Sequence, residues 1–127
     1  ITTGLSELAI DSSVGISMHK IPNRNSWSFV ERSSDKESWI SEVNIGTHEI
    51  LRLIQTPGEG GFHAWTPEGI ILMTSGGQIF QWDPELDDDH RIIANFRHMN
   101  LILSYISVSP DGKKIAIVGI QNLEMTQ

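Results

Sequence analysis

The chain has 127 residues, enough for one domain, and it contains no cysteine, so neither a disulfide framework nor a thiolate metal site is available. Nine Lys and Arg against sixteen Asp and Glu give a net charge of −7, which repels a phosphate backbone and argues against nucleic acid as a partner. The longest uninterrupted apolar run, residues 70–73, is far shorter than the roughly 20 residues that span a bilayer. We therefore expect no membrane insertion.

The first half of the chain is patterned as short strands. Residues 5–10 are expected to form an outer strand of a preceding sheet, and further strands are expected at 16–19, 27–30, 38–43 and 49–54. The Asn-Ile-Gly-Thr segment at 44–47 is a turn signal between the last two. We therefore expect a first four-stranded antiparallel unit over about residues 15–56.

The second unit, about residues 60–96, shows the same pattern most completely. A strand at 62–65 enters a Thr-Pro-Glu-Gly turn at 66–69, and strands follow at 70–74, 78–82 and 91–95. Proline at the second turn position presets φ, and glycine at the fourth supplies the left-handed conformation. The acidic stretch 85–90 is expected to be a solvated connection rather than a cation site, because it lacks the alternation of a calcium loop.

The third unit, about residues 102–119, offers strands at 105–108 and 114–118 around a Ser-Pro-Asp-Gly turn at 109–112. Pro110 lies 43 residues after Pro67, and Pro67 lies 45 residues after Pro22, which marks a degenerate first copy. A period of about 40–50 residues with strands around each turn is typical of β-propeller blades. A helix-rich fold and a stand-alone β-sandwich are the alternatives, but neither explains the recurring turn. The predicted fold class is all-β, with about two and a half to three four-stranded blades.

The segment at 109–118 (Ser-Pro-Asp-Gly-Lys-Lys-Ile-Ala-Ile-Val) resembles the TolB-like, WD-like β-propeller repeats of bacterial proteins, as do residues 64–69 together with 79–82. Trp82-Asp83 is the dipeptide that names the WD repeat, but the Gly-His pair that accompanies it in that repeat is missing. The resemblance to TolB-like repeats is therefore favoured over the resemblance to WD repeats. The resemblance covers roughly residues 15–119 and implies a ring of about six blades. A periplasmic or exported location follows from this resemblance alone.

Half a ring would leave strand edges and sheet faces open to water. Because the chain begins with Ile1 rather than Met, we expect it to be a piece of a longer protein that supplies the other blades. The alternative is self-association of two chains to complete a ring.

Four side chains are candidates for binding. His19 and His63 fall on the expected innermost strands, where they would line a central channel or pack between blades. Trp39 follows a polar loop and is the most exposed aromatic candidate for a ligand, whereas Trp65 is expected to fill the core between blades. No histidine has a metal-ligand spacing, and neither a cofactor nor a catalytic residue is predicted.

The expected function is a non-enzymatic propeller module that binds a protein or peptide, an inference by analogy from the fold. The alternative is the propeller portion of a larger peptidase-like hydrolase whose catalytic domain lies outside this sequence. A sialidase-like or glycan lyase propeller is a third class, but the characteristic sialidase boxes are absent.

Overall fold

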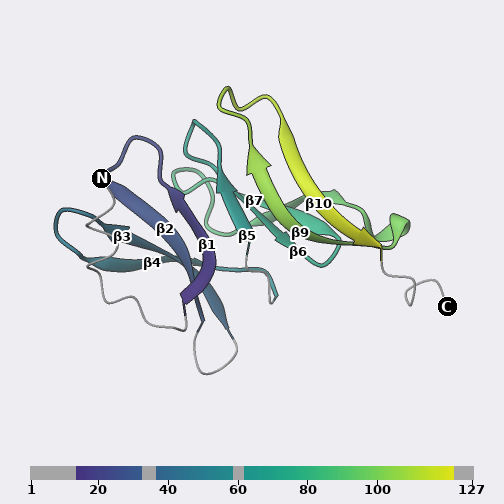
Figure 1. Cartoon of the computed structure of the whole chain (residues 1–127), viewed down its shortest axis with the longest axis horizontal. Coiled ribbons are helices and arrows are strands. Elements are labelled where there is room, and N and C mark those ends of the chain that lie inside the picture. Colours follow the sequence, from purple (N-terminus) through teal and green to yellow (C-terminus); the bar gives the residue numbers. More distant parts are fainter. Residues whose placement is uncertain (1–13, 33–36, 59–61, 122–127) are drawn as a thin grey trace.

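The computed structural model describes residues 14–32, 37–58 and 62–121, and these residues form ten β-strands (Figure 1). Within these ranges there is no α-helix, and so no helix with the length and apolar character needed to cross a membrane. A single 3₁₀ turn, η1 (Arg97–Met99), precedes the ninth strand. The strands are β1 (Val14–Lys20), β2 (Ser26–Arg32), β3 (Ser38–Asn44), β4 (Ile50–Gln55), β5 (Phe62–Trp65), β6 (Ile71–Ser75), β7 (Gln78–Trp82), β8 (Arg91–Asn95), β9 (Leu101–Val108) and β10 (Ile115–Gln121).

Each strand predicted between residues 16 and 118 is confirmed, mostly to within a residue or two at each end. The largest difference is at β9, which begins at Leu101 rather than at Tyr105. The extra length is held by pairing, because Leu101 and Ile102 lie opposite Gln121 and Ile120 of β10, beyond a bulge. The strand predicted at 5–10 lies outside the described residues.

The strands make three antiparallel sheets in which each strand pairs with its neighbour in sequence. Sheet A has the order β1-β2-β3-β4, sheet B the order β5-β6-β7-β8, and sheet C contains β9 and β10. Short turns suffice for such meanders, since an antiparallel neighbour begins where the previous strand ends. The helix-rich alternative is therefore wrong for the described residues.

The proline-marked turns join the first two strands of each sheet, as their spacing predicts. Each turn contains one residue with a left-handed backbone: Asn23 (φ 62°) in sheet A, Gly69 (φ 89°) in sheet B and Gly112 (φ 74°) in sheet C. Asparagine is one of the few residues with a side chain that tolerates this conformation. The degenerate first copy therefore keeps the turn without glycine.

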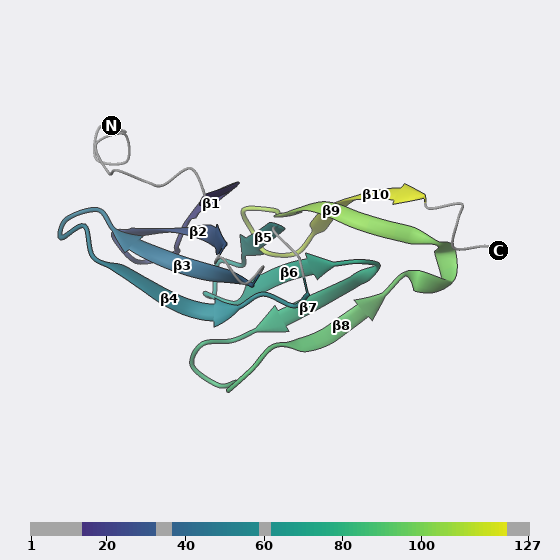
Figure 2. The same cartoon turned by 90° about the horizontal axis from the view of Figure 1, so that it is seen from below.

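The sheets pack face to face in series, with sheet B in the middle (Figure 2). The core between sheets A and B contains Val30, Ile40, Ile54, Ile71, Met73 and Trp82. The core between sheets B and C contains Ala64, Leu72, Ile79, Leu103 and Ile106. A sandwich of two sheets would leave one face of each sheet outside, whereas both faces of sheet B are covered.

Strand β6 shows why this middle sheet has a continuous apolar strand. Ile71 and Met73 point toward sheet A, and Leu72 points toward sheet C. Thr74, on the same face as Leu72, donates a hydrogen bond from Oγ1 to the carbonyl of Ser104 in β9, at 3.0 Å. The run at 70–73 is thus buried on both faces rather than helical.

The first strands of the three sheets lie side by side. The rings of His19 (β1) and His63 (β5) are 4.7 Å apart, and those of Phe62 (β5) and Tyr105 (β9) are 4.6 Å apart. The last strands of the two four-stranded sheets, β4 and β8, carry exposed apolar side chains. In Figure 2 the strands β1, β5 and β9 run along one side and β4 and β8 along the other. The described chain is all-β, with two antiparallel four-stranded sheets and a third of two strands, an arrangement compatible with blades.

Candidate functional site

His63 is buried at the junction of sheets A and B. Its side chain leaves β5 on the face that packs against sheet A, and it has no solvent exposure. Nε2 of His63 is 2.7 Å from Oγ of Ser28 on β2, which is also completely buried. The structure thus places His63 between sheets, bonded to a polar partner, and not on an open channel wall.

Trp65 joins the same network and fixes the direction of its hydrogen bonds. The indole Nε1 of Trp65 donates to Ser28 Oγ at 2.8 Å. A serine hydroxyl has one proton to give. His63 Nε2, at 2.7 Å, is a closer acceptor for it than the carbonyl of His19, at 3.3 Å. We therefore assign Nε2 of His63 as the acceptor and place its ring proton on Nδ1.

The electrostatics of the site agree with a neutral ring. Burial, and next the nearby charge of His19, lower the pKa of His63 from 6.5 to about 3. Burial also lowers the pKa of His19. An imidazole with so low a pKa accepts a hydrogen bond from the serine but is a weak base for removing its proton, and Ser28 is completely buried. The Ser28–His63 pair is therefore suited to holding two sheets together and unsuited to nucleophilic catalysis.

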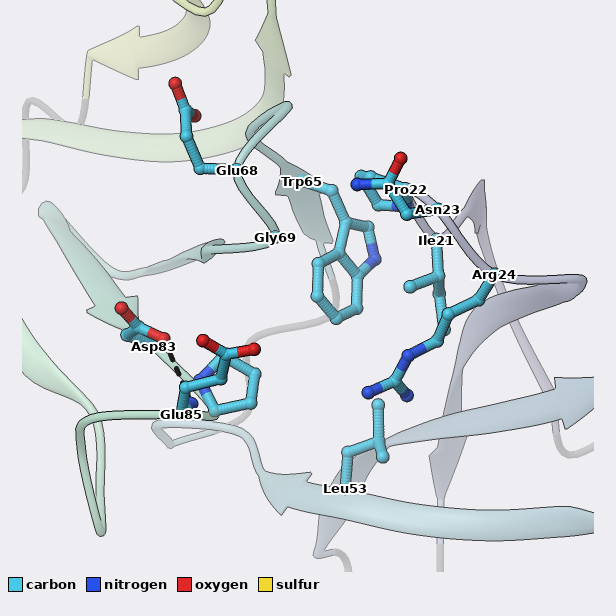
Figure 3. Close-up of a pocket in the computed structure, with 11 residues that line it drawn as sticks. Ile21, Pro22, Asn23, Arg24, Leu53, Trp65, Glu68, Gly69, Asp83 and Glu85 are labelled. Carbon is cyan, nitrogen blue, oxygen red and sulfur yellow. Dashed lines mark hydrogen bonds between the residues drawn. The ribbon is translucent and has the colours of Figure 1, made fainter.

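A cavity of about 210 Å³ opens beside Trp65, between the ends of sheets A and B (Figure 3). We call it the tryptophan cavity. Four segments meet there: the turn after β1, strand β4, the turn after β5 and the loop after β7. Its lining residues are Ile21, Pro22, Asn23, Arg24, Leu53, Trp65, Glu68, Gly69, Asp83, Pro84 and Glu85.

A second, more open hollow of about 330 Å³ lies where β1, β5 and β9 end, and Trp65 lines this one as well. We call it the inner-strand cavity. It is lined by His19, Lys20, Pro22, Ala64, Trp65, Pro67, Ser107, Val108, Ser109 and Pro110. Nζ of Lys20 donates to the carbonyls of Ile21 and Arg24, which ties this cation to the adjacent turn. His19 and Trp65 thus line a cavity shared by all three sheets.

Trp39 lies apart from these residues. It follows Ser38 on β3 and precedes Ile40, which faces the A–B core, so Trp39 points to the opposite face of sheet A. There it is half-buried, and the guanidinium of Arg52 lies 5.1 Å from its ring centroid. The same guanidinium donates from Nε to Glu31 Oε1 at 3.0 Å. A cation already covers the ring of this predicted binding residue.

The acidic stretch 85–90 forms a structured connection. Asp87 accepts hydrogen bonds from Trp82 Nε1 through its carbonyl, at 3.0 Å, and from the amide of Asp83 through Oδ2, at 3.1 Å. Among the residues that the structure describes, no three His, Asp or Glu side chains gather as a metal site. The hydrogen bonds of Asp87 therefore shape the loop that carries Asp83 and Glu85.

Comparison with known proteins adds no family assignment. No protein-family model matches the chain, and no curated protein sequence matches it significantly.

Sequence reasoning identified three of the residues that meet at this end of the sheets, His19, His63 and Trp65, but not their partners. Ser28 carries no signal of its own, because a serine on a strand is ordinary. Only its register, opposite His19 in the β1–β2 pair, would have placed it beside the inner strand. Arg24, Asp83 and Glu85 were not identified as candidates, since no pattern in the sequence reports that two sheets bring their turns together.

Proposed function

We propose that this chain is part of a β-propeller that binds a protein or peptide without catalysis, through the face formed by its turns. This turn face comprises residues 21–25, 44–49, 66–70, 83–90 and 109–114. The observation that carries the proposal is that turns of this face line both the tryptophan cavity and the inner-strand cavity, and that Trp65 belongs to both linings. Loops on a rigid scaffold are where binding residues concentrate.

The ring itself is supported by the order of the sheets. Each four-stranded meander packs face to face on the next, and the first strands β1, β5 and β9 gather on one side. A ring of blades places its first strands around the axis. The proline-marked turns lie at the same end of each sheet, with a left-handed residue at 23, 69 and 112, and those of sheets B and C have the TolB-like sequence pattern. These features support our proposal that the chain belongs to the TolB-like propellers.

We propose a function without catalysis because the contact between Ser28 and His63 lacks the properties of a catalytic pair. Ser28 and His63 are both completely buried, and the hydroxyl accepts a hydrogen bond from Trp65. A nucleophile needs access to its substrate and a base within reach that takes up its proton. The polar network instead fits a role in fixing the angle between sheets A and B.

The proposal is tested by selecting peptides from a random library on the immobilised chain and measuring their affinity by calorimetry. The bound peptides are then mapped by the amide shifts of ¹⁵N-labelled protein. We expect shifts on the turn face and none at residues 75–77 and 96–100, at the other end of the sheets. Peptides that map to that other end, or a library without any binder of millimolar affinity or better, would overturn the proposal.

A further inference from the structure

We propose that the tryptophan cavity receives a lysine or arginine side chain of the bound peptide. This inference rests on the proposed function and names the chemistry that its turn face recognises. The cavity holds about 210 Å³ and has apolar surfaces from Trp65, Leu53 and Ile21, with carboxylates on one wall. An elongated side chain with an apolar stem and a cationic end matches this combination.

The charges of the cavity favour a cation. Asp83 and Glu85 both come from the loop after β7, and Figure 3 shows the Glu85 carboxylate on the side of the cavity opposite Arg24. Arg24 is the basic residue of the lining, and its Nη1 is 2.9 Å from Oε1 of Glu42. Because Glu42 offsets the charge of Arg24, the carboxylates of Asp83 and Glu85 make the electrostatic potential in the cavity negative.

The loop holds the carboxylate of Asp83 and the backbone of Glu85 in place before any ligand arrives. Oδ1 of Asp83 accepts the amide of Glu85 at 3.0 Å, and the amide of Asp83 donates to Asp87 at 3.1 Å. This arrangement is an Asx turn, in which a side chain stands in for a backbone acceptor. A preformed wall lowers the ordering cost of binding.

Trp65 offers a fixed aromatic surface to the same ligand. Its indole N–H donates a hydrogen bond to the completely buried Ser28 at 2.8 Å, which fixes the orientation of the ring. In Figure 3 the ring stands between Arg24 on one side and Glu85 on the other. A cation brought to Glu85 therefore comes close to an aromatic ring, where cation–π attraction adds to the ion pair.

Asp88 supplies a matched control. It belongs to the same loop as Glu85, but it is exposed and is not among the residues that line the tryptophan cavity. Asp88→Asn removes one negative charge from this loop, as Glu85→Gln does, and leaves the carboxylates that line the cavity in place.

The test is an NMR titration of the ¹⁵N-labelled 127-residue chain with three blocked tripeptides: acetyl-Gly-Lys-Gly-amide, the same peptide with norleucine, and the same peptide with glutamate. The readouts are the indole N–H signal of Trp65, assigned with Trp65→Phe, and the amides of residues 83–85. We expect millimolar binding of the lysine peptide alone, weakened at about 1 M salt, where the Debye length is roughly 3 Å. Glu85→Gln should weaken binding by about three- to fivefold, and Asp88→Asn should not.

The outcomes separate the two proposals. Binding of the lysine peptide that depends on Glu85 and not on Asp88 supports the inference. If all three peptides shift the turn face equally, or if Asp88→Asn weakens binding as much as Glu85→Gln, the assignment of a basic side chain to this cavity is overturned while peptide binding stands. No shift at Trp65 or at residues 83–85 with the lysine peptide overturns the assignment as well. The proposed function is tested separately, by the library selection described above.

Discussion

Gly112, in the turn after β9, lies against Pro67, in the turn after β5. A Cβ atom on Gly112 would come within 2.9 Å of Pro67 Cδ, closer than such contacts occur. The φ angle of Gly112 is 74°, in the left-handed region. The equivalent turns of sheets B and C therefore touch, and glycine is required at 112 both for its backbone and for the space it leaves.

Gly112→Val should destabilise the fold more than Gly69→Val. Both substitutions place a branched side chain at a positive φ, which costs on the order of 1–2 kcal/mol. At Gly69 a Cβ meets nothing within 4 Å, whereas at Gly112 it meets Pro67. The clash should add about 1–3 kcal/mol. Urea unfolding of both variants measures the difference, and equal losses would contradict the contact between the two turns.

Trp65→Ala should cost about 3 kcal/mol, because the half-buried indole packs against the core between sheets A and B. Trp65→Phe keeps most of this packing but loses the donor to Ser28, so it should cost about 1 kcal/mol. Thermal and urea denaturation give both values. A neutral Trp65→Ala would place the indole outside the core and contradict the packing described here.

The strands were predictable because each one is bounded by turn chemistry that acts locally. Proline at 22, 67 and 110, with a residue that tolerates a left-handed backbone after it, marks every first hairpin without reference to the rest of the fold. The start of β9 at Leu101 was missed for the opposite reason. Its first residues are held by Gly119 to Gln121, a partner selected by register across a bulge and not by a local signal.

The site was only partly predictable, because its residues come together through packing between sheets. His63 and Trp65 alternate with Ala64 on β5, so the sequence assigns the first two to one face. It does not report that Ser28 of another sheet lies beneath both, or that the loop after β7 faces the turn after β1. Those relationships depend on the angle between sheets A and B, which side-chain packing sets.

Acid should destabilise the protein through His63. Its pKa is lowered from 6.5 to about 3 by burial and the charge of His19, so the folded protein binds fewer protons at this residue than the unfolded chain. The contribution to stability is complete above pH 6.5 and falls with decreasing pH until about pH 3. Between pH 7 and pH 5 the loss from this group should be about 2 kcal/mol.

The measurement is the free energy of unfolding from pH 7 to pH 4 for the wild type and for His63→Gln. Glutamine keeps a polar side chain beside Ser28 but has no proton to gain, so the variant should have the flatter profile. The ¹⁵N shifts of the His63 ring at pH 7 should also report a neutral ring with its proton on Nδ1. Parallel profiles for the two proteins would show that His63 is not the group that titrates.

Sheet C should mediate self-association if the ring is completed by a second copy of the chain. Its face away from sheet B carries Ile102, Val118 and Ile120, with exposed fractions of 39%, 50% and 61%. The equivalent face of sheet B is covered by sheet C. A further sheet that packed on sheet C would cover its apolar face in the same way. We expect the mass in sedimentation equilibrium to rise with concentration, and Ile120→Lys to shift it toward the monomer. Ile92→Lys, on the exposed outer strand β8, is the matched control and should leave the association unchanged. A wild-type chain that stays monomeric throughout would rule out completion of the ring by a second copy.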